Sequence, residues 1–124
     1  MNVQQVKDYC RQCVGAEERQ VGHPYNILSY GIDGKKFAYF KTSQPQQWRF
    51  SVRVSAEQFV ELTDNANINP ARYMGRFHWI TIIDVKQIDA EYLQQLIQDS
   101  YTRALRSLSK KRQAELQRST DLKQ

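Results

Sequence analysis

The chain has 124 residues, a length that fits one domain with a modest core. Apolar residues make up 40% of it, and no apolar run approaches the roughly 18 residues of a membrane span. The N-terminus has neither the basic nor the apolar region of a secretory signal, so the sequence predicts a soluble cytoplasmic protein. Two cysteines and three prolines exclude a disulfide scaffold and a collagen-like chain.

The net charge of +5 is unevenly distributed along the chain. Residues 1–100 contain 11 basic and 11 acidic side chains, whereas residues 101–124 contain 7 basic and 2 acidic ones. Within the neutral part, residues 35–76 carry 7 basic and 3 acidic side chains. Clustered positive charge favours polyanions such as nucleic acid, but it also solubilises a surface, and both interpretations remain open here.

Hydrophobic periodicity predicts the elements of the N-terminal half. Apolar residues at steps of three and four predict a helix over 2–13, and the pattern becomes strand-like over 26–42. Asp33-Gly34, in the middle of that stretch, predicts a tight hairpin turn. The clearest strand is 48–54, whose period-two alternation predicts a core face and a basic, solvent-facing side. The core face would carry Trp48, Phe50, Val52 and Val54, and the basic side Arg49, Ser51 and Arg53.

The next segment predicts a short helix and one buried strand. Ser55 and Gln58 have the spacing of a capping box, which favours a helix that ends before residue 64. An irregular loop is expected over 65–76, followed by a strand over 78–83 that Asp84 closes.

Two helices are expected at the C-terminus. Asp89 caps a long one whose apolar residues continue to Leu108, and Ser109 begins a short one that extends through Leu116. The polar residues 117–124 should fray, which leaves 1–116 as a single domain. This order of elements predicts an α+β fold, an antiparallel sheet with the N-terminal and C-terminal helices packed on one face.

Cys10 and Cys13 have the C-x-x-C spacing of redox pairs and of half a metal site. A redox pair lies at a helix N-terminus after a strand, whereas this pair falls at the C-terminal end of the first helix. His23 and His78 are the only two histidines, and neither has the spacing of a zinc ligand. We interpret the cysteines as small core residues and expect no metal and no cofactor.

No catalytic motif is present, so the sequence predicts a protein that is not an enzyme. Nucleophile elbows, metalloprotease helices and glycine-rich phosphate loops are all missing from the sequence. His78 is the one candidate acid or base near a strand carboxylate, Asp84, and we interpret it as a structural residue beside Trp79.

Basic and aromatic residues alternate in three segments, a mixture that nucleic-acid binders use to neutralise phosphates and stack on bases. The main hypothesis is therefore a DNA-binding module in which the Asp33-Gly34 hairpin acts as a wing. The expected phosphate contacts are Lys35, Lys36, Lys41, Arg49, Arg53, Arg72 and Arg76.

The alternative is an adaptor without a nucleic-acid role. A groove near Tyr73, His78 and Trp79 would then bind a small ligand or a partner protein, and a homodimer fits the same features. Cations at the end of the long helix favour its dipole or contact phosphate without reading sequence. These cations are Arg103, Arg106, Lys110, Lys111 and Arg112.

The chain resembles the MmcQ/YjbR family of small bacterial proteins over almost its whole length. The likeness is carried by Gly15-Ala16-Glu17-Glu18, Asp33-Gly34-Lys35-Lys36-Phe37-Ala38, Pro70, His78-Trp79 before a strand ending in Asp84, and Leu96-Ile97 with Ser100-Tyr101. Gly75-Arg76 replaces the usual Asn-Lys, Val14 the usual Pro, and Val85 the usual Gly.

The resemblance implies a CyaY-like fold of the double-wing type, with hairpin wings that contact DNA. It brings no catalytic residues. CyaY is a frataxin homologue, so the resemblance also suggests iron binding through an acidic first helix. In this sequence that helix offers only Asp8, with Glu17 and Glu18 beyond its end.

Overall fold

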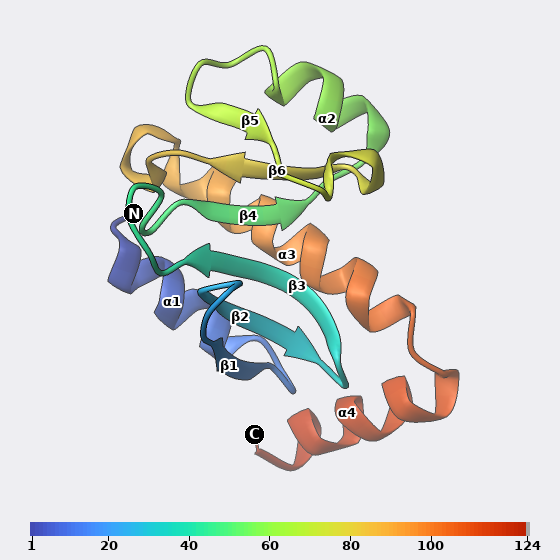
Figure 1. Ribbon diagram of the computed structural model, residues 1–124. Helices are drawn as coiled ribbons and strands as arrows, with labels where there is room; N and C mark the ends of the chain where they lie inside the picture. The colour runs from blue at the N-terminus through green and yellow to red at the C-terminus, as the bar shows by residue number, and fades with distance from the viewer. Residues whose placement is uncertain (124) are drawn as a thin grey trace.

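The computed structural model describes the backbone of residues 1–123 and the side chains of residues 1–118. Its centre is a six-stranded antiparallel sheet of order β1-β2-β3-β4-β6-β5 (Figure 1). The strands are β1 (Glu17–Val21), β2 (Ile27–Ile32), β3 (Lys35–Lys41), β4 (Phe50–Arg53), β5 (Ile68–Pro70) and β6 (Trp79–Ile82). The helices are α1 (Val3–Gln12), α2 (Ala56–Leu62), α3 (Ala90–Arg106) and α4 (Lys110–Lys123), with short 3-10 turns η1 (Gly75–Phe77) and η2 (Val85–Gln87).

Helices α1 and α3 cover the same face of the sheet, behind the strands in Figure 1. Val6 of α1 and Ile97 of α3 share one buried cluster with Phe40, Phe50 and Ile80 of the central strands. Burial of aliphatic and aromatic side chains on this scale is what stabilises a small sheet against its helices. The predicted α+β fold, with an antiparallel sheet and terminal helices on one face, is confirmed.

The ends of the elements follow from local hydrogen bonding. Ser55 Oγ accepts from the Gln58 backbone N–H, and the Gln58 side chain accepts from that of Ser55, so the predicted capping box begins α2. Asp89 accepts from the Tyr92 N–H at 3.0 Å and begins α3, as the sequence predicts. Asp33 and Gly34, at φ 48° and 80°, form the turn between β2 and β3, because both positions of such a turn need positive φ.

The strand predicted over 48–54 is shorter and less exposed than expected. Trp48 has φ 68°, so the chain is still turning there and β4 begins at Phe50. Ser51, expected to face solvent, is only 2% exposed, and its hydroxyl is hydrogen-bonded to that of Thr81 on β6 at 2.7 Å. The face of the sheet opposite the helices is therefore partly covered.

Two strands were missed at the edges of the sheet. β1 pairs with β2, yet it is almost entirely exposed and polar, so no alternation marks it in the sequence. β5 lies within the segment expected to be an irregular loop and pairs with β6. It ends at Pro70, which lacks an N–H and is tolerated at an edge strand.

The C-terminal helix is longer than predicted. It was expected to end at Leu116, but α4 continues to Lys123, while Gln124 lies outside the described residues. Leu116 is buried in the core cluster, and the helix returns along the β2–β3 hairpin. None of the helices in the described part of the chain is long and apolar enough to cross a membrane.

Candidate nucleic-acid interface

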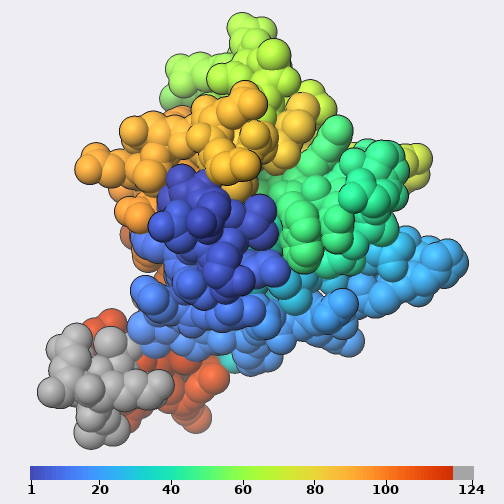
Figure 2. All heavy atoms as spheres, turned by 90° about the vertical axis from the view of Figure 1, so that its left-hand side faces the viewer, coloured from blue at the N-terminus to red at the C-terminus, as the bar shows by residue number. Residues whose placement is uncertain are grey.

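The face of the sheet away from α1 and α3 is hollowed. Three loops line it: the one between β1 and β2, the one between β3 and β4, and the one between β5 and β6. In Figure 2, which is turned by 90° from Figure 1, the light-blue residues after β1 extend on the side opposite the orange residues. Together the loops enclose a hollow of about 550 Å³, here called the sheet groove.

The floor of the sheet groove is formed by neutral side chains of the central strands. Tyr39 of β3, Ser51 of β4 and Thr81 of β6 lie next to one another in register. The Tyr39 ring packs against Trp79 with centroids 5.6 Å apart. Burial raises the pKa of Tyr39, so its hydroxyl stays protonated at neutral pH and can donate as well as accept a hydrogen bond.

The rim of the sheet groove is basic. Lys41 reaches across to the Tyr25 carbonyl, 2.7 Å from Nζ, and holds the loop between β1 and β2 in place. On the other side the Arg72 guanidinium lies over the Tyr73 ring, 4.9 Å from its centroid. Tyr73 is 81% exposed and has φ 66°, a left-handed conformation that is costly for an aromatic residue.

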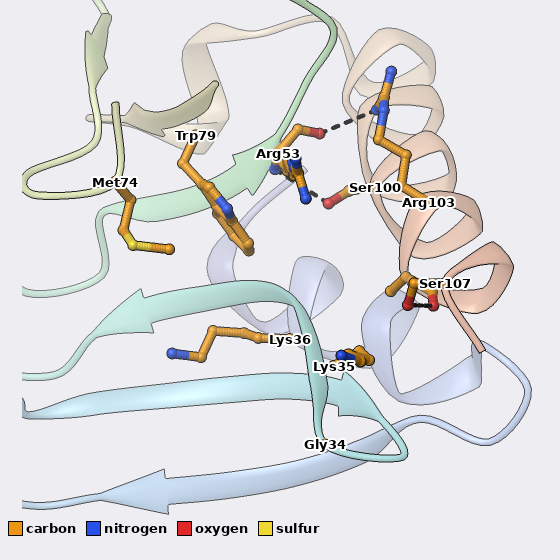
Figure 3. Close-up of a pocket in the computed structure, with 10 residues that line it drawn as sticks. Gly34, Lys35, Lys36, Arg53, Met74, Trp79, Ser100, Arg103 and Ser107 are labelled. Carbon is orange, nitrogen blue, oxygen red and sulfur yellow. Dashed lines mark hydrogen bonds between the residues drawn. The ribbon is translucent and has the colours of Figure 1, made fainter. Parts of the chain in front are cut away.

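A second hollow, of about 320 Å³, lies where α3 passes the end of the β2–β3 hairpin, and is here called the hairpin pocket. Figure 3 shows Ser100 and Arg103 of α3, with Ser107 at the C-cap of that helix, on one side of the pocket. Lys35 and Lys36 lie below, and Met74 and Trp79 lie opposite. Lys36 and Met74 also line the sheet groove, so the two hollows form one continuous surface.

This surface has a single sign of charge. Among the described residues, 7 basic side chains and no carboxylate line the two hollows. The basic set is Lys35, Lys36, Lys41, Arg49, Arg53, Arg72 and Arg103. Two arginines elsewhere are instead paired with carboxylates: Arg11 with Glu18 at 2.7 Å, and Arg112 with Asp33 at 2.6 Å. A concave surface of unpaired cations concentrates anions from solution.

Six of the seven residues predicted as phosphate contacts line this surface, and Arg76 does not. The Arg76 guanidinium lies over the Phe77 ring, 4.7 Å from its centroid, outside both hollows. Arg103 was assigned to the helix end instead, because nothing local shows that α3 passes the hairpin. Its three- and four-residue spacing from Ser100 and Ser107 is the one sequence signal that groups these side chains on a single stripe.

The three residues of the alternative groove, Tyr73, His78 and Trp79, do not line a single hollow. Tyr73 lines the sheet groove and Trp79 the hairpin pocket, where only 5% of Trp79 is exposed. His78 ends η1 in a left-handed conformation, and its ring lies 5.7 Å from that of Phe59 on α2. The position of His78 therefore fits a packing role.

The two cysteines lie away from this surface. Cys10 is fully buried in the core, and burial raises the pKa of its thiol well above the usual range. Burial likewise raises the pKa of Cys13 to about 11, so both remain thiols at neutral pH. In the described part of the chain, no group of three or more His, Cys, Asp or Glu side chains is arranged to hold a metal ion.

The fold and the site together define a small α+β protein with one helix-covered face and one cation-lined open face. A family model described as YjbR matches residues 12–103, and the chain belongs to this family. No curated protein matches the sequence closely enough to count as a relative.

Two solved structures have the same fold. A Deinococcus radiodurans protein described as carrying the family domain DUF419 has a TM-score of 0.76 and 24% sequence identity, covering 93% of this chain and 87% of its own. A Pseudomonas syringae protein has a TM-score of 0.66 and 20% identity, covering 84% of this chain and 99% of its own. At these identities the likeness establishes the fold alone.

Proposed function

We propose that this protein binds DNA without catalysis. The sheet groove holds the phosphates, and the β2–β3 hairpin acts as a wing that contacts the DNA. The observation that carries the proposal is the convergence of seven basic side chains on one surface with no carboxylate among the described residues that line it. Residues far apart in sequence, from Lys35 to Arg103, supply that charge. Neutralising several phosphates at once releases counterions, the main source of affinity for nucleic acid.

Aromatic side chains support the same proposal. Tyr73 presents its ring at the rim of the groove, held in a strained backbone conformation next to Arg72. An exposed ring beside a cation can stack on an unpaired base while the guanidinium contacts the adjoining phosphate. Strain that the rest of the structure sustains is concentrated at functional positions in proteins.

Fluorescence anisotropy with labelled single-stranded and duplex DNA tests the proposal, across a range of salt concentrations. The logarithm of the binding constant should fall linearly with the logarithm of salt, by about 0.7 to 0.9 for each phosphate contacted. Arg49→Ala combined with Arg72→Ala should weaken binding and reduce the slope by roughly two, one for each contact removed.

The matched control removes the same charge from outside the groove. Lys86 and Arg106 are both exposed and line neither hollow, so Lys86→Ala with Arg106→Ala should leave the slope unchanged. If both double variants lose the same amount of DNA affinity, the binding is a general attraction to polyanions. Absence of DNA binding by the wild-type chain at physiological salt would favour the adaptor with a small ligand or protein partner.

A further inference from the structure

The hairpin pocket differs from the sheet groove in shape and in the density of charge. Four basic side chains surround a hollow of about 320 Å³: Lys35, Lys36, Arg53 and Arg103. That volume lies at the lower end of the range of small-molecule sites, about 300–1,000 Å³. The pocket therefore suits one compact anionic group with its attached ring better than an extended strand.

Backbone hydrogen bonds fix the two arginines. Arg53 Nε donates to the Phe77 carbonyl at 3.1 Å. An Arg103 terminal nitrogen donates to the Arg53 carbonyl at 3.3 Å, as Figure 3 shows. Each guanidinium has five N–H donors, so most remain for a ligand. Neither arginine is paired with a carboxylate among the described residues, in contrast to Arg11 and Arg112.

A buried serine sets the position of one of these arginines. Ser100 Oγ donates to the Phe37 carbonyl at 2.6 Å and accepts from the Arg53 N–H at 3.1 Å. This hydroxyl joins α3 to β3 and β4 directly behind the pocket. The cations consequently stand on connected, ordered elements, which lowers the cost of holding them together around an anion.

Lys36 lines the hairpin pocket, and no carboxylate lines it with Lys36 among the described residues. Its ammonium lies over the Tyr39 ring, 5.3 Å from the centroid, and partial burial lowers its pKa. A cation partly withdrawn from water, in a pocket that three other basic residues line without a carboxylate, is unfavourable until an anion enters. On the opposite wall, Met74 and the edge of Trp79 provide apolar surface for a sugar or a ring.

We propose that the hairpin pocket binds a phosphomonoester dianion, carried either by a free nucleotide or by the end of a nucleic-acid strand. A phosphomonoester has a charge of about −1.5 to −2 at pH 7, against about −1 for the phosphodiester within a strand. It therefore gains more from the four cations that line the pocket. This inference does not rest on the proposed DNA binding, because a free nucleotide would fill the pocket alone.

Isothermal titration calorimetry with four probes tests the proposal: thymidine 5′-phosphate, thymidine, and one short single-stranded oligonucleotide with a 5′-phosphate or a 5′-hydroxyl. The phosphorylated member of each pair should bind at least about tenfold more tightly, because its phosphate accepts charge-assisted hydrogen bonds that the unphosphorylated probe cannot form. This preference should grow between pH 5 and pH 7.5, as the phosphate loses its second proton near pH 6. If thymidine 5′-phosphate binds as tightly as the phosphorylated strand, the phosphate that the pocket binds belongs to a free nucleotide. If the phosphorylated strand binds more tightly, that phosphate belongs to the end of a strand.

Arg103→Gln should abolish the preference for the phosphate, whereas Arg106→Gln, a change of the same charge on the exposed side of α3, should preserve it. Lys35→Gln provides a second variant in case the loss of the Arg103 hydrogen bond impairs folding, which circular dichroism reports. Equal affinity for the phosphorylated and unphosphorylated probes overturns the inference while leaving DNA binding intact. Retention of thymidine 5′-phosphate binding without any binding of the 5′-hydroxyl strand supports the pocket and contradicts the proposed DNA binding.

Discussion

Arg112 of α4 and Asp33 at the tip of the β2–β3 hairpin form a two-point ion pair across 79 positions of sequence. Arg112 Nε lies 2.6 Å from one carboxylate oxygen, and a terminal nitrogen lies 3.2 Å from the other. The pair joins the last helix to the turn immediately before Lys35 and Lys36. The placement of the hairpin therefore depends on a residue far along the chain.

Arg112→Gln should lower Tm at neutral pH by only a few degrees, because exposed ion pairs contribute little to the free energy of unfolding. The guanidinium holds the pKa of Asp33 below its usual range, so the pair stabilises the fold above about pH 4. That contribution disappears as pH falls through the lowered pKa. Thermal melts should therefore show a larger difference between wild type and Arg112→Gln at pH 7 than at pH 3, whereas Lys111→Gln should match wild type at both.

Ser100→Ala should cost about 1–3 kcal/mol of unfolding free energy. The change leaves the Arg53 N–H and the Phe37 carbonyl without their buried partner. Urea denaturation measures the loss. Ser107→Ala is the control, since Ser107 Oγ donates only to the Ala104 carbonyl in the same helix, and equal effects of the two changes would contradict a bridging role for Ser100.

Gly15→Ala should destabilise the fold by about 1–3 kcal/mol. Gly15 has φ +78°, and an added Cβ would lie 2.9 Å from Leu116 Cδ2 and 3.3 Å from Ile32 Cδ1. The comparison is Gly22→Ala, where nothing lies within 4 Å and the change should be nearly neutral. If urea denaturation gives the same midpoint for both variants, the close approach of α4 to Gly15 is wrong.

Cys13 should react slowly with iodoacetamide at pH 8 in the folded protein. Burial raises the pKa of its thiol to about 11, so the thiolate fraction is about a hundredfold lower than for an unfolded cysteine. Mass spectrometry of labelling with and without urea measures the ratio of rates. Fast labelling of the folded chain would show that the end of α1 opens readily.

Much of the fold could be predicted because local chemistry and tertiary packing agree there. Asp33-Gly34 makes the turn that its residue types require, and Asp89 begins α3 where the apolar stripe begins. β1 was missed because an exposed edge strand carries no alternation. Trp48 was placed in the strand because its aromatic character continues the period-two pattern, whereas only its left-handed backbone shows that it lies in the turn.

The candidate site was less predictable than the fold. Residue type alone was enough to select six cations that now line one surface, because strands and loops of a single basic segment supply them. Arg103 could not be assigned from sequence, since its place depends on where α3 crosses the sheet. Arg76 was included for its charge, but its aromatic neighbour Phe77 holds it outside the hollows.

The ion pair of Arg112 with Asp33 has a practical consequence for anyone who alters the C-terminus. A truncation before α4 would remove the ion pair that braces the turn in front of Lys35, although it would alter none of the side chains that line the hairpin pocket. Loss of binding in such a chain would combine lost positive charge with lost bracing. Single substitutions within the 124-residue chain separate the lost charge from the lost bracing.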